Sequence, residues 1–380
     1  MMFTVTPIFD SEFHASASRF AKDAEIENSG LQRANDKKRF HEKKWRETID
    51  LGWPACLIPE EDGGLGGTVI DFCALLEGTA THALPLSLSA GMGLPAILLS
   101  ALDFQNKASL LSAMAEGSVR LQPIYQPLDP FLKQMSHEMT LRIKTASNAT
   151  ILDGKVTGVE HIPQATHYLL CCSNQEGDPS LWLIPTTEIS PVISHEIRID
   201  SRDSLSLNFN DQPLREEWCI ASGSSFSTAY DRMFNFGALF SCVEAVSCMG
   251  TALEQTIRYL SERQQFGVTL STFQVLRHDL ANIYAKYESI RAFVSAFTQK
   301  VSDTGVIPER ELSLLKIYLS QVGPKIAHTV IQVHGGMGMT EELWATRLNK
   351  RILMTSLEYG DGQFHSERAH TLQKMVEQHA

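Results

Sequence analysis

The sequence predicts an α+β fold in three parts: an N-terminal helical domain over residues 1–118, a central antiparallel, barrel-like β domain over 119–222, and a C-terminal four-helix bundle over 223–380. Two changes in residue pattern predict this order. Apolar residues recur at helical spacing in the first part and again in the third. Between them, short β-branched and aromatic runs alternate with turn residues, which is typical of antiparallel strands. A chain of 380 residues is long enough for two or three such domains.

The first part combines helices with breaks. Residues 11–49 mix charged and apolar positions at helical spacing, and Pro54 and Pro59 interrupt the segment after them. Four glycines within residues 63–67 predict a loop, but no Gly-Lys-Ser/Thr comes after them, so they are a weak signal for a phosphate-binding loop. Residues 78–102 carry no charged side chain, yet they contain two prolines and several glycines. This composition predicts a buried, broken helical region and not a membrane-spanning helix.

The middle part alternates apolar runs with turn residues such as Asp153-Gly154 and Asp211–Pro213. The runs that predict strands are Leu141–Lys144, Tyr168–Cys172, Leu181–Ile184 and Leu205–Phe209. In the third part, long apolar-periodic stretches predict helices over Ser225–Arg263, Gln274–Val301 and Glu309–His334.

The composition excludes several classes of partner. Lys and Arg total 33 against 44 Asp and Glu, for a net charge of −11, which argues against a nucleic-acid or anionic-membrane surface. The seven cysteines are odd in number and include no Cys-x-x-Cys pair, which is typical of a reducing compartment. The N-terminus has no basic and apolar leader, so we expect a cytoplasmic protein. We expect no metal site and no membrane association.

Three segments together point to one family: LGWPACLIPEEDGGLGG (51–67), RYLSERQQFGVTLSTFQVLRHDLANIY (258–284) and IQVHGGMGMTEELWATRLNKR (331–351). In order and spacing they resemble the acyl-CoA dehydrogenases. The resemblance covers essentially the whole chain. It implies FAD as the cofactor, an acyl-CoA thioester as the substrate, α,β-dehydrogenation as the reaction, and an electron-transfer flavoprotein as the electron acceptor.

The second and third segments carry the predicted cofactor residues. Arg263 closes a long helix, where its guanidinium can grip phosphate oxygens in a bidentate manner, and Phe266 can offer a ring to a planar cofactor. The alternative is an ordinary helix end in which Arg263 pairs with a carboxylate. The resemblance implies that the set reaches the FAD of a neighbouring subunit, and hence an oligomer. The predicted FAD-binding residues are Arg263, Gln265, Phe266, Gln274, Gln332, Gly335 and Gly336.

The sequence departs from the family at the catalytic base, which must be a carboxylate in a water-poor pocket. The usual base position is occupied by Gly360, and its neighbours Glu358 and Asp361 are out of register. Other members carry the base on the preceding long helix, where the matching position is closest to Gly237. Glu244 lies two turns later, on a small and polar helical face. Glu244 is therefore either the base or a structural carboxylate bonded to a buried Arg or to backbone.

The middle part also departs from the family. The flavin loop corresponds to IYQPLDPF (124–131), which lacks the usual Gly and Ser, and the flavin-covering element corresponds to EHIPQATHY (160–168), which lacks Trp. This resembles the small subunits of heteromeric acyl-CoA dehydrogenases of the pimeloyl-CoA and steroid side-chain kind. The resemblance implies an α2β2 heterotetramer with a paralogous acyl-CoA dehydrogenase subunit, in lipid or steroid catabolism. The alternatives are a self-sufficient homomeric dehydrogenase using Glu244, or a non-catalytic scaffold paralogue.

Overall fold

The computed structural model describes residues 4–28, 34–125, 141–146, 149–173, 178–340 and 343–379. The chain forms two compact units, each assembled from separate stretches of sequence. The first unit comprises residues 1–30, 69–84 and 237–380, and the second comprises 31–68 and 85–236. The N-terminal helices therefore divide between the two units. The domain boundaries after residues 118 and 222 stay predictions, although strand β1 begins at Leu121 and helix α7 at Gly223.

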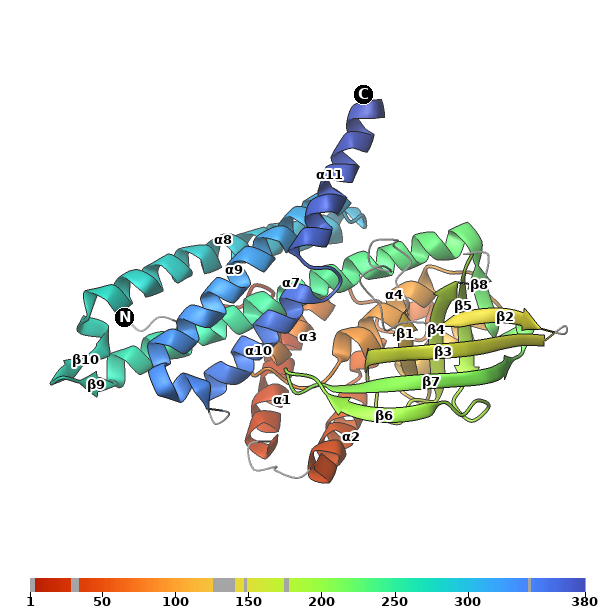
Figure 1. The fold of residues 1–380 in the computed structure, drawn as a ribbon, viewed down its shortest axis with the longest axis horizontal. Coiled ribbons are helices and arrows are strands. Elements are labelled where there is room, and N and C mark those ends of the chain that lie inside the picture. Colours follow the sequence, from red (N-terminus) through yellow and green to blue (C-terminus); the bar gives the residue numbers. More distant parts are fainter. Residues whose placement is uncertain are drawn as a thin grey trace. The chain divides into compact units, whose positions relative to one another are not determined.

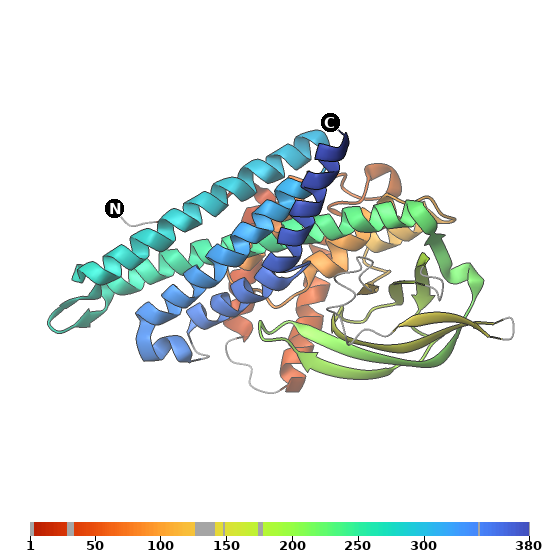
Figure 2. The same ribbon diagram turned by 45° about the horizontal axis from the view of Figure 1, so that its top comes forward.

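The first unit is helical, as Figures 1 and 2 show. In it α9 lies against α8, α10 and α11, and α1 packs along α3. The helices are α1 (Glu12–Asn28), α3 (Val69–Ala80), the part of α7 (Gly223–Glu262) from Gly237 onward, α8 (Gln274–Thr304), α9 (Glu309–His334), α10 (Trp344–Leu357) and α11 (Gly362–His379). The long helices predicted from periodicity are confirmed, with ends within three residues of those expected.

Helix α7 is the most apolar of the long helices. Its composition and length would let it cross a membrane, but 94% of its most apolar 18-residue window is buried inside the protein. Only its length and composition make it a candidate membrane span, and the core helix of a globular protein has the same length and composition. Among the described residues no other helix of 18 or more residues is as apolar.

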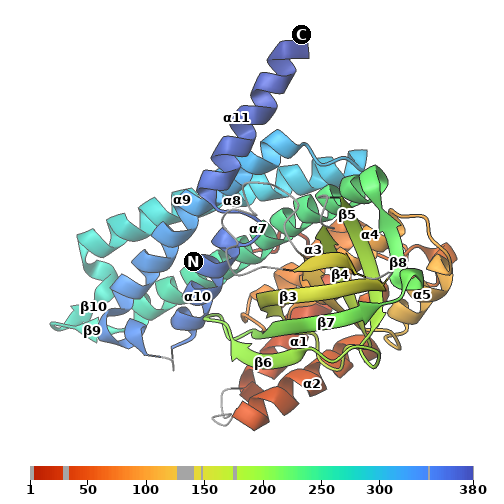
Figure 3. The ribbon, with the colours of Figure 1, turned by 45° about the vertical axis from the view of Figure 1, so that its right-hand side comes forward.

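The second unit holds the two four-stranded sheets, together with α2 (Ala34–Asp50), α4 (Leu94–Ser100) and α5 (Lys107–Ala115). One sheet has the strand order β1-β4-β5-β8 and the other β2-β3-β7-β6. Figure 3 shows β3, β7 and β6 of the second sheet lying side by side. The strands are β1 (Leu121–Tyr125), β2 (Arg142–Ala146), β3 (Ala149–Glu160), β4 (His167–Ser173), β5 (Pro179–Pro185), β6 (Val192–Ile197), β7 (Asp203–Leu214) and β8 (Cys219–Ser222).

The sheets confirm the α+β class and correct two details of it. Apolar side chains from both sheets form one core, including Ile124, Leu170, Val156 and Leu207. The two sheets do not close into a barrel. The pairing is antiparallel except between β1 and β4, which are parallel, with Leu121 beside His167. The chain passes through β2 and β3 of the other sheet before it returns as β4, and a long crossover of this kind permits parallel pairing.

Two predicted turns lie inside strands. Asp153-Gly154 falls within β3, and Asp211–Pro213 falls within β7. The two strands pair with each other, and their register shifts between Leu152 and Gly154, next to Gly154 with a φ of 119° and Asp211 with a φ of 45°. Glycine and aspartate accommodate the positive φ angles of a β-bulge, so these residues mark a bulge here and not a chain reversal.

The charge-free stretch and the glycine loop behave as the sequence predicts. Residues 78–102 are mostly buried and are broken into the end of α3, a π-helical turn over Ser89–Gly93 and α4. In the glycine loop the backbone amides donate inward: the N–H groups of Leu65, Gly66 and Gly67 bond the carbonyls of residues 55, 58 and 56. Because these amides are already used, the loop cannot cradle a phosphate with them.

Candidate functional site

The predicted cofactor residues gather at one end of the first unit. There α7 ends, the β9–β10 hairpin (Gln264–Gln265 and Val268–Thr269) comes next, and α8 begins, while α9 ends and α10 begins beside them (Figures 1 and 3). Three rings in contact join these helix ends: His334 stacks on Tyr259 and meets Trp344 edge-on. The His334 imidazole lies 4.4 Å from the Tyr259 ring of α7 and 5.3 Å from the Trp344 ring of α10, measured between centroids. The motif residues, separate in sequence, therefore form one surface.

The hairpin presents an aromatic ring at its tip. Gln265 pairs with Val268, so Phe266 and Gly267 form a two-residue turn, with φ angles of 56° and 79°. A hairpin turn of this type needs positive φ at both positions, and a non-glycine residue there costs about 1–2 kcal/mol. The Phe266 side chain is 88% exposed and makes an edge contact with Phe273, at 6.2 Å between centroids. An exposed ring in an unfavourable backbone conformation suits a contact made outside this chain.

Arg263 lies at the base of the hairpin with a fixed backbone and an exposed side chain. Its N–H donates to the Tyr259 carbonyl at 2.8 Å, and its carbonyl accepts from the Leu270 N–H at 2.8 Å. Within the described part of the chain no carboxylate pairs with its guanidinium, in contrast to the nearby Arg258, which lies 3.5 Å from Glu254. Five N–H donors of a permanent cation therefore remain for an anionic group from elsewhere.

The Gly335-Gly336 turn is open. Gly335 has a φ of 59°, and its N–H donates to the Gln332 carbonyl, which ends α9. A Cβ atom built at either glycine would meet no atom within 4 Å. Gln332 is exposed, as are Gln265 and Gln274. The absence of any obstacle beside the two glycines leaves room for a large ligand or a second chain to approach the backbone.

His334 is a residue of this surface that sequence reasoning missed. It is buried, and its Nδ1–H donates to the Val330 carbonyl at 2.8 Å, so Nε2 is an acceptor. No donor to Nε2 is found in the described ranges. Burial lowers the pKa of His334, so the ring is neutral and packs as an aromatic spacer between Tyr259 and Trp344. The histidine directly before the glycine pair was the available signal.

The two positions predicted for the catalytic base, Gly360 and Gly237, both lie in the first unit. Gly360 has a φ of 98°, and a Cβ atom there would lie 2.2 Å from the Phe364 ring. A Cβ atom at Gly237 would lie 2.4 Å from the Tyr359 ring. Each glycine is thus covered by an aromatic ring, and neither position can carry a carboxylate unless its neighbour moves.

Buried polar groups hold in place the turn between α10 and α11, which contains Tyr359 and Gly360. The Lys316 ammonium donates to the carbonyls of Thr355, at 3.0 Å, and Glu358, at 2.6 Å, at the end of α10. His365 Nε2–H donates to the Tyr359 carbonyl at 3.0 Å. Burial lowers the pKa of Lys316, and burial with the nearby Lys316 charge lowers the pKa of His365 to about 3. The clamped carbonyls fix Tyr359, whose φ is 56°, against Gly237.

The neighbouring acids are engaged in structural bonds. Asp361 Oδ1 accepts the Phe364 N–H at 2.9 Å and so caps the start of α11. Glu244 is 6% exposed, and its carboxylate accepts a hydrogen bond from Arg351 Nη1 at 3.1 Å. Arg351 also donates to the Leu84 carbonyl at 3.0 Å. Glu244 thus has the buried arginine partner that its structural alternative requires.

In the second unit, the part of the flavin loop after Tyr125 (residues 126–131) lies outside the described residues. The second element is described. Glu160 pairs with Arg198 and, at 3.3 Å, with Arg202, while His161 lies 3.9 Å from the Asp203 carboxylate. Ion pairs fix this segment where the family has an aromatic residue. A search of the described residues finds no cluster of His, Cys, Asp and Glu that could hold a metal ion.

Comparison with known proteins decides the family. The model of the acyl-CoA dehydrogenase N-terminal domain matches residues 10–118, and that of the C-terminal domain matches residues 226–370. The chain belongs to the acyl-CoA dehydrogenase family. It is therefore a member of a family of oxidoreductases that dehydrogenate acyl-CoA, with FAD as the cofactor.

Individual relatives of this acyl-CoA dehydrogenase are distant. The probable acyl-CoA dehydrogenase FadE25 of Mycobacterium tuberculosis is 24% identical over 363 residues, which cover 92% of this chain and 91% of FadE25. The ChsE4-ChsE5 complex from Mycobacterium tuberculosis matches with a TM-score of 0.79 and 18% identity, over 98% of each chain. Butyryl-CoA dehydrogenase from Megasphaera elsdenii matches with a TM-score of 0.81 and 18% identity, over 98% of this chain and 100% of that one. These structures share the fold.

The surface around Arg263 fits part of an FAD site. The exposed guanidinium offers donors to phosphate, and Phe266 offers a ring. The space beside Gly335 and Gly336 admits a large ligand. When bound, FAD accepts the hydride that leaves the β-carbon of the acyl group. On this surface, this chain's own residues would bind and orient the cofactor.

Proposed function

We propose that this chain is one subunit of a heteromeric, FAD-dependent acyl-CoA dehydrogenase, and that it supplies the Arg263 surface to a flavin held by a paralogous acyl-CoA dehydrogenase subunit. The observation that carries the proposal is a contrast within the first unit. The Arg263 surface is open and unobstructed, whereas Gly360 and Gly237, the two positions predicted for a base, are covered by aromatic rings. A chain that keeps one half of a site and lacks the other requires a partner.

The chemistry divides between the subunits accordingly. Dehydrogenation removes a proton from the α-carbon of the acyl-CoA and a hydride from the β-carbon, and the C=C bond forms between them. The partner's carboxylate takes the proton in this proposal. This chain positions the cofactor through Arg263, Gln265, Phe266, Gln274 and Gln332, with Gly335 and Gly336 giving access. The similarity to a chain of the ChsE4-ChsE5 complex supports a heteromeric assembly, and we propose an α2β2 arrangement.

We assign a structural role to Glu244. A general base needs a free lone pair aimed at its proton and room for the substrate beside it. Instead, one carboxylate oxygen of Glu244 accepts a hydrogen bond from Arg351, which also donates to the Leu84 carbonyl. The pair ties α7 to α10 and to the chain just after α3. This role is compatible with the heteromeric proposal and disfavours a self-sufficient enzyme that uses Glu244.

Further parts of the proposal rest on the family. We propose a bulky lipid or steroid acyl group as the substrate, an electron-transfer flavoprotein as the electron acceptor, and a cytoplasmic location. We propose no nucleic-acid and no membrane partner, because the net charge is −11.

A reconstitution experiment tests the proposal. The chain, its paralogous partner and the co-expressed pair are assayed for acyl-CoA-dependent reduction of an artificial electron acceptor. We expect turnover from the pair and none from this chain alone. If the partner alone were fully active and this chain did not change its activity, this chain would be a non-catalytic scaffold. Turnover by this chain alone, abolished in Glu244→Gln, would establish the self-sufficient enzyme instead.

A further inference from the structure

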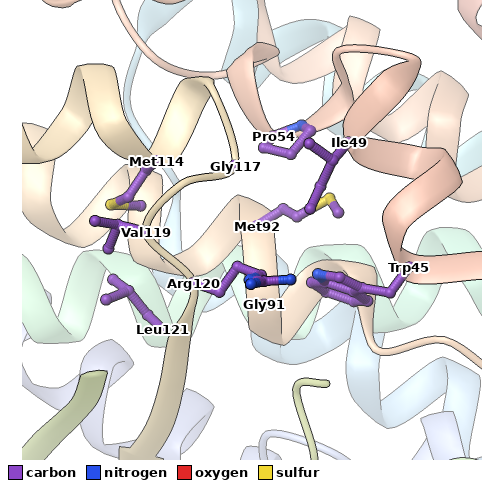
Figure 4. A pocket seen from close by; sticks show the side chains of 10 residues that line it. All are labelled: Trp45, Ile49, Pro54, Gly91, Met92, Met114, Gly117, Val119, Arg120 and Leu121. Atoms are coloured by element: carbon purple, nitrogen blue, oxygen red, sulfur yellow. The ribbon is translucent and has the colours of Figure 1, made fainter. Parts of the chain in front are cut away.

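The second unit contains a small cavity between α2, the π-helical turn before α4, and the chain that leads from α5 into β1. Its volume is about 20 Å³, which is room for one water-sized or monatomic occupant. Figure 4 shows the lining, with Met92 and Met114 among the apolar walls and the side chains of Trp45 and Arg120 facing each other across the space.

Two nitrogen atoms of this lining lack partners. Trp45 is only 2% exposed, and its indole Nε1–H has no acceptor among the described residues. The Nε–H of Arg120 is likewise buried and unbonded within the described ranges. Both atoms are donors only. A buried donor without an acceptor costs roughly as much as a lost hydrogen bond, and here two such donors line one small space.

The donors are held in place by their surroundings. A Cβ atom at Gly91 would lie 2.4 Å from the Trp45 ring, so the indole is packed tightly against that glycine. The Arg120 N–H donates to Thr166 Oγ1 at 3.1 Å, and its carbonyl accepts from the Thr166 N–H at 2.8 Å. Arg120 Nη1 donates to Gln164 Oε1 at 3.0 Å. Arg120 lines the cavity, and Nε–H is the buried donor of its side chain for which the described residues offer no acceptor.

The charge around the cavity is positive. No carboxylate pairs with Arg120 in the ranges that the structure describes, since its side chain and backbone bond the neutral Gln164 and Thr166. Burial and the nearby Arg46 lower the pKa of Arg120, but a guanidinium stays protonated at neutral pH. An occupant that accepts from both donors and carries negative charge would relieve both the missing bonds and the repulsion between the two arginines.

We propose that this cavity binds a monatomic anion, chloride under physiological conditions, between Trp45 Nε1–H and Arg120 Nε–H. The small volume and the apolar walls, which include Met92 and Met114, favour a monatomic ion over a polyatomic or strongly hydrated one. The bound anion links α2 to the start of β1, because Trp45 belongs to α2 and Arg120 directly precedes Leu121. The site is independent of the proposed catalytic role.

The first unit contains a larger cavity, but the carboxylates in its wall already have hydrogen-bond partners. It has a volume of about 270 Å³, and the carboxylate of Glu77 in its wall already accepts the N–H groups of Ile8, at 2.7 Å, and Phe9, at 2.8 Å. Glu254 accepts the Val5 N–H at 3.0 Å. Its carboxylates already bind backbone amides of this chain, so they do not call for a ligand.

Thermal unfolding in chloride tests the proposal. The full chain is titrated from 0 to 200 mM NaCl, with sodium gluconate holding the ionic strength constant, because gluconate is too large for the cavity. We expect a saturable rise in Tm. Trp45→Phe and Arg120→Met should each weaken the chloride dependence by roughly tenfold or more. The matched control pair is Trp218→Phe and Arg215→Met, since Arg215 lies 5.2 Å over the Trp218 ring outside the cavity, and both should keep the wild-type response.

A second measurement holds if a cavity variant fails to fold. Crystals of the wild-type protein are soaked in bromide, and the anomalous map is inspected at the cavity. A bromide peak within hydrogen-bond distance of both nitrogen atoms would support the proposal. An electron-density peak in the cavity that has no anomalous signal would identify a water molecule and overturn the proposal. A chloride response that is absent, or equal in the cavity variants and the controls, would also overturn it.

Discussion

Replacing Glu244 by Gln separates its structural role from a catalytic one. The carboxylate lies 3.1 Å from Arg351 Nη1, and both residues are almost fully buried. The amide would keep the shape but leave the Arg351 charge uncompensated, and removing one partner of a buried ion pair costs about 3–5 kcal/mol. For 380 residues, an unfolding entropy of roughly 2.1 cal/mol/K per residue gives about 0.8 kcal/mol/K. We therefore expect Tm to fall by about 4–6 °C.

The assay for this variant has two readouts. Tm is measured by calorimetry, and turnover is measured in the assembled hetero-complex at a temperature well below the transition. We expect turnover to stay within a few-fold of wild type. The matched control is Glu254→Gln on the same helix. Its amide oxygen can still accept the Val5 N–H, and the partly exposed ion pair to Arg258 that it loses is worth at most about 1 kcal/mol, or about 1 °C. Turnover reduced a thousandfold with Tm unchanged would refute the structural assignment.

Three further outcomes are expected from the geometry. Arg263→Ala should weaken FAD binding by the complex roughly 10–150-fold, the equivalent of about 1.5–3 kcal/mol, while the control Arg258→Ala should not. Equal flavin occupancy of the two variants at limiting FAD would contradict the assignment of Arg263 to FAD binding. Gly237→Ala should destabilise the chain by about 1–3 kcal/mol, because its Cβ meets the Tyr359 ring. The same change should cost much less in a Tyr359→Gly background, and an equal cost in both backgrounds would show that the two residues do not touch. The pKa of His365 is about 3 in the folded state, against about 6.5 in the unfolded state. The His365 contribution to the free energy of unfolding should therefore be complete above pH 6.5 and fall by about 1.4 kcal/mol per pH unit towards pH 3. In His365→Gln, chemical denaturation at a series of pH values should show a weaker dependence of the unfolding free energy on pH.

The sequence alone predicted the helical parts, because their signals are local. It also singled out the residues that gather around Arg263, whose role in flavin binding stays a prediction. Arg263, Phe266 and Gly335 each sit at or near the end of a helix, where a few neighbouring residues determine the backbone. The gathering of these helix ends at one place results from the long antiparallel helices. His334 was not recognised, because its role depends on rings contributed by two other helices.

The base region could not be predicted in the same way. That Tyr359 covers Gly237 is a contact between residues more than 100 positions apart, and no spacing rule indicates it. The Lys316 clamp is likewise non-local and places an ammonium in the core, where sequence rules seldom expect one. In the sheets, Asp153-Gly154 predicted a turn, but pairing with β7 converted it into a bulge inside a long strand. Tertiary pairing overrides turn propensity at such positions.

The flavin content of the purified protein tests the central claim most directly. The ratio of flavin absorbance to protein is measured after gel filtration, for this chain alone and for the complex with its paralogous partner. A homo-oligomer would present the Arg263 surface to a middle domain that lacks the usual flavin-loop Gly and Ser, and so would forfeit several hydrogen bonds of about 0.5–1.5 kcal/mol each. We expect almost no flavin in this chain alone and about half an FAD per chain in the complex. One FAD per chain in the homo-oligomer would contradict the account.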